Sequence, residues 1–304
     1  MNLSVKIKNK TLHNPIGVAS GTFGYGEEYA PLCDLNKIGA IYTKAITLEP
    51  RAGNPTPRIV ETPSGMLNAI GLANVGVEKF IAEKLPWLNE KLQQTAIIPN
   101  IAGTSEEDYC AVIEKLEEIA GVWGFEINLS CPNVKKGAMQ FGTDPKLVEK
   151  ITAKLRDLTP KPLIIKLSPN VWDICEIAAA AEAGGADAVS CINTLVGMVI
   201  DTKKCRPVLA NKTGGLSGPA IRPVGVRMVY QVSRKVKIPV VGMGGIMCTD
   251  DAIQYFLAGA KAIQIGTANF VEPQVSNTVL SGIEDWMRER NIEDISQIST
   301  LLED

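Results

Sequence analysis

Short runs of apolar and β-branched residues recur along the chain, each bounded by Gly, Pro or polar residues. They cover residues 15–20, 40–45, 96–103, 124–130, 162–168, 186–193, 238–245 and 260–267. Stretches with helical periodicity lie between most of them, including 105–120, 144–158 and 173–185, and several open with a Ser, Thr or Asp cap. Continuous apolar strands that alternate with helices are typical of a parallel sheet covered on both faces. Eight such units predict an α/β fold, a single (β/α)8 TIM barrel over residues 1–304.

Three further segments do not fit the strand–helix alternation. Residues 3–14 alternate between apolar and polar positions around a turn at 8–10, which predicts an N-terminal hairpin that closes the bottom of the barrel. The connections 46–76 and 194–220 are long insertions after the second and sixth strands. Both follow the carboxyl end of a strand, the end where barrels build their active sites, so we expect them to be binding loops.

Composition narrows the possible partners. The net charge of −2 over 304 residues, without a dense Lys or Arg run, predicts neither nucleic acid nor a membrane surface as a partner. The first residues lack the apolar core of a signal peptide, and no apolar run approaches the roughly 20 residues of a membrane span, so a cytoplasmic protein is expected. Seven cysteines without a Cys-x-x-Cys pair favour neither a disulfide framework nor a metal site, and most of them are expected to be buried apolar thiols. His13 is the only histidine, so proton transfer would use Cys, Lys or a carboxylate.

Polar side chains stand at or near the carboxyl ends of five predicted strands. They are Lys44, Asn100, Asn128, Lys166 and Asn193. They could satisfy one another and nearby carbonyls, but five on one rim favour a bound ligand. Two lysines without an Asp or Glu at equivalent strand ends further indicate that this ligand is anionic.

Glycine-rich segments follow the last two strands, at 242–251 and 264–270, and a third lies at 214–218. Glycine allows close approach of the backbone, and the exposed N–H groups can hold a phosphate. Each segment alone is a weak signal, because Gly also ends strands for steric reasons. Together they favour a phosphorylated cofactor, since barrels commonly bind phosphate at these two loops.

Several motifs together resemble one enzyme family. They are "AITLEPRAGNPTPR" (45–58), "LNAIGLAN" (67–74), "NLSCPN" (128–133), "IIKLSPN" (164–170), "INTLVGM" (192–198), "GGLSGPAIRP" (214–223), "VVGMGGI" (240–246) and "IQIGTA" (263–268). The sequence resembles the class 1 dihydroorotate dehydrogenases, flavin-dependent barrel enzymes of pyrimidine synthesis, over nearly its whole length. The segments 21–29 and 134–145 are most similar to the catalytic subunit of the NAD-linked branch, class 1B. Ala73 and Val75 depart from the family's usual "GLQNPG" loop.

The resemblance implies a set of ligands and site residues. FMN would be bound by this chain, and a partner electron-transfer subunit would carry FAD and a [2Fe–2S] cluster, with a homodimer of this chain inside a heterotetramer. The expected FMN contacts are Ser20, Gly21, Lys44, Ala45, Asn100, Asn128, Lys166, Ile192, Gly218, Gly244, Gly245, Gly266 and Thr267. The expected contacts of the substrate dihydroorotate are Lys44, Asn68, Ala69, Ile70, Gly71, Leu72, Asn128, Asn193 and Thr194. No metal ion is expected.

Cys131, in the turn after the strand 124–130, is the candidate catalytic residue. In the family's chemistry a base removes the proton from C5 of dihydroorotate while hydride leaves C6 for the flavin. A thiol beside a cationic site can be partly ionised at neutral pH and so serve as that base. Glu126, deeper in the same strand, is the rival base, and a packed turn cysteine is the alternative reading of Cys131.

Other functions remain compatible with these residues. The enzyme could belong to the fumarate-linked class 1A, or reduce another pyrimidine. A lyase that forms a Schiff base on Lys166 is a third possibility, because a lysine at a strand end in an apolar pocket is also typical of that chemistry. A subunit that binds FMN without catalysis is the fourth, which a catalytic role for Cys131 would exclude.

Overall fold

The computed structural model describes residues 1–129 and 141–303. Within them, a nine-stranded parallel sheet runs in the order β7-β4-β3-β17-β16-β11-β10-β9-β8. Its strands are β3 (Ile16–Val18), β4 (Ala40–Tyr42), β7 (Ala96–Ile98), β8 (Asn100–Ile101), β9 (Phe125–Asn128), β10 (Leu163–Lys166), β11 (Ala188–Cys191), β16 (Val240–Met243) and β17 (Ala262–Ile265). The two edge strands, β7 and β8, are separated only by Pro99, so the sheet closes into a barrel of eight chain segments. All eight predicted strands and the TIM barrel are confirmed.

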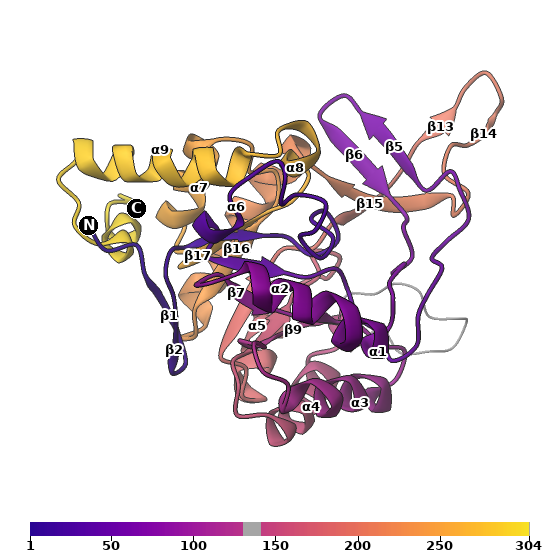
Figure 1. The fold of residues 1–304 in the computed structure, drawn as a ribbon. Coiled ribbons are helices and arrows are strands. Elements are labelled where there is room, and N and C mark those ends of the chain that lie inside the picture. Colours follow the sequence, from indigo (N-terminus) through magenta and orange to yellow (C-terminus); the bar gives the residue numbers. More distant parts are fainter. Residues whose placement is uncertain (130–140, 304) are drawn as a thin grey trace.

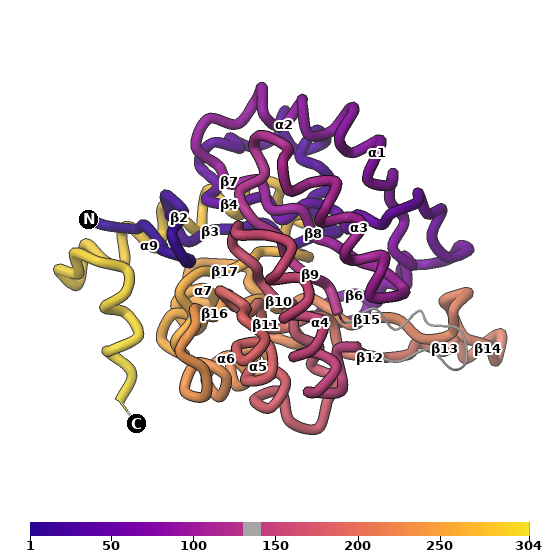
Figure 2. The backbone as a smooth tube through the Cα atoms, turned by 90° about the horizontal axis from the view of Figure 1, so that it is seen from below, coloured from indigo at the N-terminus to yellow at the C-terminus, as the bar shows by residue number. Residues whose placement is uncertain are grey.

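Helices surround the barrel on its outside (Figures 1 and 2). They are α1 (Val77–Lys79), a π-helical turn (Phe80–Lys84), α2 (Leu85–Lys91), α3 (Glu106–Glu117), α4 (Pro145–Leu158), α5 (Ile174–Ala183), α6 (Arg222–Lys235), α7 (Thr249–Leu257), α8 (Ala268–Val271) and α9 (Val275–Glu289). Predicted caps are present at three of them, because the side chains of Ser105, Asp144 and Asp173 accept hydrogen bonds from N–H groups in the first turns of α3, α4 and α5.

A hairpin of β1 (Val5–Ile7) and β2 (Lys10–Leu12) closes the amino end of the barrel, as predicted. Val5, Ile7 and Leu12 pack in one cluster with inward-facing residues of the barrel strands, among them Ile98 and Ile164. Lys8, at the turn, has a φ of 56°. The hairpin therefore fills the amino end of the barrel with apolar side chains.

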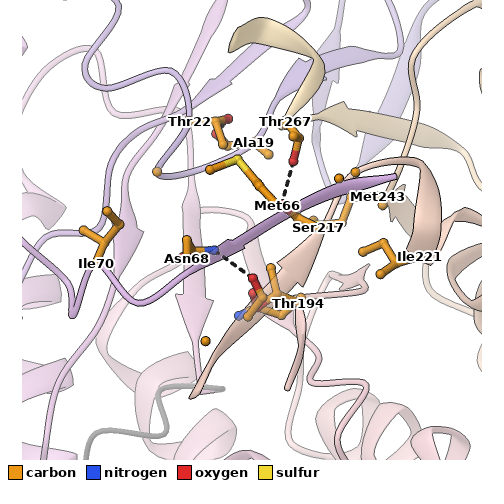
Figure 3. Close-up of a pocket in the computed structure, with 18 of the residues that line it drawn as sticks. Ala19, Thr22, Met66, Asn68, Ile70, Thr194, Ser217, Ile221, Met243 and Thr267 are labelled. Carbon is orange, nitrogen blue, oxygen red and sulfur yellow. Dashed lines mark hydrogen bonds between the residues drawn. The ribbon is translucent and has the colours of Figure 1, made fainter. Parts of the chain in front are cut away.

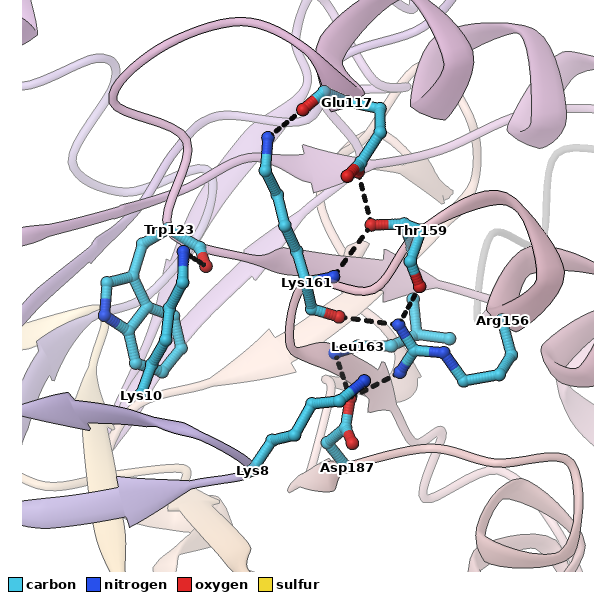
Figure 4. A network of polar contacts seen from close by, with 9 residues as sticks. All are labelled: Lys8, Lys10, Glu117, Trp123, Arg156, Thr159, Lys161, Leu163 and Asp187. Carbon is cyan, nitrogen blue, oxygen red and sulfur yellow. Dashed lines mark hydrogen bonds and ion pairs between the residues drawn. The ribbon is translucent and has the colours of Figure 1, made fainter.

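A polar network surrounds this closed end (Figure 4). Asp187, which precedes β11, forms ion pairs with Arg156 of α4 and, at 3.5 Å, with Lys8 of the hairpin turn. Lys161 donates to the backbone carbonyl of Glu117 at the end of α3. The network joins α3, α4, the hairpin and the start of two barrel strands. Its charged groups therefore find their partners within the protein.

The two long insertions form a common structure at the opposite end. The first contributes β5 (Ile59–Thr62) and β6 (Gly65–Asn68), and the second contributes β12 (Leu195–Met198), β13 (Ile200–Asp201), β14 (Arg206–Pro207) and β15 (Thr213–Ser217). Strands β12, β15, β6 and β5 pair in this order as an antiparallel sheet that projects from the barrel (Figure 1). Both insertions were predicted, but their pairing across more than a hundred residues was not.

Candidate active site

A cavity of about 1290 Å³ lies between the carboxyl ends of the barrel strands and the projecting sheet. Among its lining residues are Ser20, Gly21, Lys44, Ala45, Asn68, Ala69, Ile70, Gly71, Leu72, Asn128, Lys166, Ile192, Asn193, Thr194, Gly218, Gly244, Gly245, Gly266 and Thr267. The structure thus brings nearly all of the predicted cofactor and substrate residues into one site. Figure 3 shows Asn68 and Thr194, from different insertions, pointing into the same space.

One predicted residue of the described ranges, Asn100, is not part of this lining. Asn100 is fully buried, and its Nδ2 donates to Glu126 Oε2 at 2.6 Å, so it lies beneath the cavity rather than on its wall. Pro99 interrupts the predicted strand between β7 and β8. Asn100 therefore begins β8 instead of ending a strand at the rim of the barrel. Cys131 lies outside the described residues, so its role stays a prediction.

The floor of the cavity contains a buried ion pair. Lys166 Nζ, on β10, lies 3.7 Å from Glu126 Oε2, and the exposed fractions of the two side chains are 6% and 0%. This corrects the sequence-based premise that Lys166 is an unpaired cation. Glu126 faces the barrel interior two residues before Asn128, as the strand alternation predicts, but unlike Asn128 it does not line the cavity.

Lys44 is the second cation of the site. It lines the cavity, and its ammonium has no ion-pair partner among residues 1–129 and 141–303. Burial, and then the nearby Arg58 guanidinium, lower the pKa of Lys44, while the charge of Glu28 opposes this. A half-buried ammonium without an ion-pair partner in the described residues is suited to an anionic ligand.

Amide side chains supply donors and acceptors on the cavity wall. Asn68 Nδ2 donates to the carbonyl of Gly215 at 3.3 Å, a contact that ties the two insertions together (Figure 3). Asn193 Oδ1 accepts from the backbone N–H of Thr194 at 2.8 Å, and Asn193 Nδ2 lies 3.5 Å from Asn128 Oδ1. These bonds orient the amides of Asn68 and Asn193 and leave both of them further hydrogen-bonding capacity, which suits a flat ligand with amide edges.

Four glycines line the cavity at points where the backbone itself forms the wall. Gly21 has a φ of +91°, and a Cβ built on it would meet nothing within 4 Å. Gly244 and Gly245 after β16 have φ values of +127° and +68°, a region that side chains rarely adopt. Gly266 follows β17, where the nearest atom to a built Cβ is 3.4 Å away. The backbone at these points can approach a flat or phosphorylated ligand closely.

Several lining residues were not predicted from the sequence. Gln264 lines the floor of the cavity, and its Nε2 donates to Glu126 Oε1 at 2.7 Å. It is a polar residue inside an apolar strand, which is the same sequence signal that pointed to Asn128. Ser217 accepts from Thr267 Oγ1 at 2.7 Å (Figure 3). Met66 lies on β6, next to Ser217 on β15, so only the pairing of the insertions could have identified both.

The remaining cysteines were expected to be packed thiols. Of those in the described part of the chain, Cys110 and Cys191 are buried, whereas Cys205 and Cys248 are exposed. Burial raises the pKa of Cys191 well above its ordinary value, so this thiol stays protonated. The packing prediction is wrong for Cys205, which lies at the tip of a projecting hairpin, and Cys248, which was set apart after the Gly-Gly segment, is exposed at the N-cap position of α7.

Over the described ranges, no helix has the length and apolar character needed to cross a membrane. The same ranges contain no group of three or more His, Cys, Asp and Glu side chains that could hold a metal ion.

Comparison with known proteins places this site in a family. The family model described as dihydroorotate dehydrogenase matches residues 2–287. A relative from Geotalea uraniireducens (strain Rf4), named dihydroorotate dehydrogenase B (NAD(+)), catalytic subunit, is 54% identical over 297 residues, 98% of this chain and 97% of its own. A relative of the same name from Trichlorobacter lovleyi is 55% identical over 301 residues, which cover 99% of this chain and 98% of its own.

A solved structure confirms the fold independently. The crystal structure of DHODH in complex with ferulenol from Eimeria tenella superposes with a TM-score of 0.81, covering 98% of this chain and 87% of that one, at 22% sequence identity. At this identity the likeness bears on the barrel alone. With the family match over nearly the whole chain and the NAD-linked B type of its relatives, the chain belongs to the dihydroorotate dehydrogenase family, as the motifs had indicated.

Proposed function

We propose that this chain is the catalytic subunit of an NAD-linked dihydroorotate dehydrogenase, with residues 1–304 acting as one catalytic domain that oxidises (S)-dihydroorotate to orotate in pyrimidine biosynthesis. The observation that carries the proposal is the single cavity, which gathers the predicted cofactor and substrate residues at the carboxyl end of the barrel. The names of the two relatives described above, both of the B type, support the NAD-linked branch over the fumarate-linked one.

The residues present fit FMN. The space beside Gly21, the glycines after β16 and β17, and the ammonium of Lys166 at the floor provide room for a ring system, a place for a phosphate and a charge to face the ring. FMN, when bound, supplies the hydride acceptor for the oxidation. Gly218, Gly244, Gly245, Gly266 and Thr267 would hold its phosphate and ribityl chain.

Dihydroorotate would be bound by the rest of the wall. Its carboxylate would face the ammonium of Lys44, which has no ion-pair partner among the described residues. Its amide edges would meet Asn68, Asn128 and Asn193, whose side chains are held in place by the hydrogen bonds given above. The projecting sheet, whose strands line one side of the cavity, would help to exclude water from the reacting atoms.

Cys131 would remove the proton from C5 of the substrate. Its rival, Glu126, is disfavoured as the base because it is fully buried outside the cavity lining and its oxygens accept three hydrogen bonds. A base must come within hydrogen-bond reach of the proton that it removes. Lys166 as a Schiff-base nucleophile is likewise disfavoured by its ion pair, since such a lysine must be uncharged to attack a carbonyl.

Electron transfer to NAD⁺ would need a second subunit with FAD and a [2Fe–2S] cluster. Homologues named as catalytic subunits support the existence of such a partner. The test measures dihydroorotate oxidation by the purified chain with NAD⁺, with fumarate and with an artificial dye, alone and after co-expression with a candidate partner. The proposal expects dye reduction by the chain alone and NAD⁺ reduction only with the partner. Efficient fumarate turnover by the isolated chain would instead assign it to class 1A.

A further inference from the structure

Two backbone segments that line one end of the cavity lie against each other. One covers residues 218–222 and leads into α6, and the other is the turn 244–248 between β16 and α7. A Cβ built on Gly245 would lie 2.6 Å from the carbonyl oxygen of Gly218 and 3.0 Å from the backbone nitrogen of Arg222. A side chain would not fit between the segments, so their backbones form this part of the wall directly.

A buried carboxylate joins these two segments. Asp251, in the first turn of α7, is 3% exposed. Its Oδ2 accepts from the backbone N–H of Met247 at 2.9 Å, and its Oδ1 is ion-paired with the guanidinium of Arg222. Asp251 and Arg222 are not among the described residues that line the cavity. The pair therefore lies behind the wall and ties the turn before α7 to the residue that begins α6.

A second contact holds the other end of the turn. Tyr255, which is fully buried on α7, donates from its hydroxyl group to the Gly244 carbonyl at 2.7 Å. The same hydroxyl lies against α6, because a Cβ built on Gly225 would lie 2.1 Å from it. Tyr255 thus fixes the Gly244 end of the turn, and Asp251 fixes its Met247 end and its distance from α6.

We propose that Asp251 is a positioning residue for the cofactor phosphate, because its ion pair with Arg222 sets the distance between the two backbone segments that receive this group. The identity of the cofactor as FMN rests on the proposed function. Backbone N–H groups bind an anion well when they are held in place before it arrives, and here they come from segments that precede two different helices. Asp251 is itself an anion whose charge opposes phosphate binding, so its contribution comes from position.

The test compares the affinities of the apo-protein for FMN and for riboflavin, in a buffer without phosphate, by fluorescence quenching. Riboflavin has the same ring and ribityl chain but no phosphate, so the ratio of the two dissociation constants reports on the phosphate alone. In Asp251→Asn, the single acceptor oxygen of the amide cannot accept from both Met247 and Arg222. We expect the preference for FMN to fall about tenfold, while riboflavin affinity stays within about twofold of wild type.

The sign of this change separates position from charge. If the pair acted through its charges, Asp251→Asn would remove a negative charge near the phosphate and raise the preference for FMN. The double variant Arg222→Met/Asp251→Asn removes both charges and leaves no unpaired one, so it also serves if the single variant folds poorly. It should again lose about tenfold of the preference, because the segments are no longer joined. A preference that rises or stays the same in Asp251→Asn, or that the double variant keeps, overturns the proposal.

Asp187→Asn is the matched control. Asp187 is likewise ion-paired with an arginine, Arg156, and accepts from a backbone N–H, that of Leu163 at 2.9 Å, but at the amino end of the barrel. Its variant should keep the wild-type preference for FMN, and an equal fall would overturn the proposal by showing a general loosening of the fold. A wild-type chain that binds neither flavin overturns the proposed function and this inference with it. A wild-type preference for FMN that Asp251→Asn retains in full overturns this inference alone.

Discussion

The two ends of the barrel use their charged residues differently. At the amino end, Asp187 is paired with Arg156 and Lys8, and its carboxylate also accepts from the N–H of Leu163 at 2.9 Å (Figure 4). At the carboxyl end, Lys44 is partly buried without an ion-pair partner in the described residues, and Gly21 borders open space.

This difference separates the part of the barrel that stabilises the fold from the part that binds. Polar groups whose hydrogen bonds are satisfied inside the protein contribute to stability, whereas a cation held without a partner costs stability until a ligand supplies the opposite charge. Substitutions at the amino end should therefore change unfolding, and substitutions at the carboxyl end should change binding and rate. The following variants test this division, from the largest expected effect to the smallest.

The largest effect is expected for Cys131→Ala, which removes the predicted base. Dihydroorotate should reduce the bound flavin about 10²–10⁴-fold more slowly, roughly 3–5 kcal/mol in activation free energy, while FMN content and orotate binding stay close to wild type. Rapid mixing under anaerobic conditions measures the rate. Cys248→Ala, at an exposed cysteine, is the matched control and should react at the wild-type rate. Normal reduction by Cys131→Ala would return this cysteine to a role in the turn.

At the amino end, Asp187→Asn should lower the free energy of unfolding by about 2 kcal/mol, because hydrogen bonds to a charged group contribute more than neutral ones. Urea denaturation of the apo-protein measures this loss. The rate of flavin reduction and the FMN dissociation constant should stay unchanged in the same variant. If either moved more than about twofold, the two ends would be coupled, and the division proposed here would be wrong.

Gly21→Ala and Gly26→Ala form a matched pair. The two glycines have φ values of +91° and +92°, so an alanine at either should cost about 1 kcal/mol of stability. Only Gly21 lines the cavity, where its new methyl group would occupy space meant for the ligand. FMN affinity, measured by fluorescence quenching, should fall about tenfold for Gly21→Ala and stay constant for Gly26→Ala. Equal losses of affinity would show that backbone strain, and not the cavity, is responsible.

The smallest effect is expected for Lys44→Met in the apo-protein, where stability should rise slightly near neutral pH. Burial and Arg58 lower the pKa of Lys44 in the folded protein. At pH values between this lowered pKa and the ordinary pKa, the unfolded chain therefore binds more protons than the folded protein. Below this window, the charged Lys44 lowers the free energy of unfolding by its full amount, and this cost disappears as pH rises through the window. The stability gained by Lys44→Met should shrink in parallel. Lys8→Met at the amino end should instead lose stability, because that ammonium is ion-paired with Asp187 at 3.5 Å. Urea titrations at several pH values distinguish the two signs.

The barrel could be predicted from the sequence because its signals are local. Each strand is a short apolar run, and residues such as Asn128 and Lys166 stand at strand ends, where the direction of a parallel strand already fixes their place. The hairpin at the amino end follows from its own alternation and turn. For these elements, neighbours along the chain determine the structure.

The parts that could not be predicted depend on distant residues. Asn68 and Gly215 are joined by a sheet between two insertions, and neither insertion alone indicates the other. Lys166 looked unpaired because its partner, Glu126, stands inside another strand rather than at its end, and only the register of β9 and β10 brings their charges together. Asn100 stands near the strand end, yet its amide points to the same carboxylate and not to the cavity.

The measurement that tests the account most directly is the bleaching of the flavin by substrate. The purified chain, loaded with FMN and kept without oxygen, is mixed with dihydroorotate while the absorption of the oxidised flavin is followed and orotate is quantified. We predict rapid bleaching with one orotate formed for each FMN, and no NADH from added NAD⁺ until the partner subunit is present. A flavin that stays oxidised in excess dihydroorotate, in protein that binds FMN tightly, would contradict the assignment of the carboxyl end as the site of this oxidation.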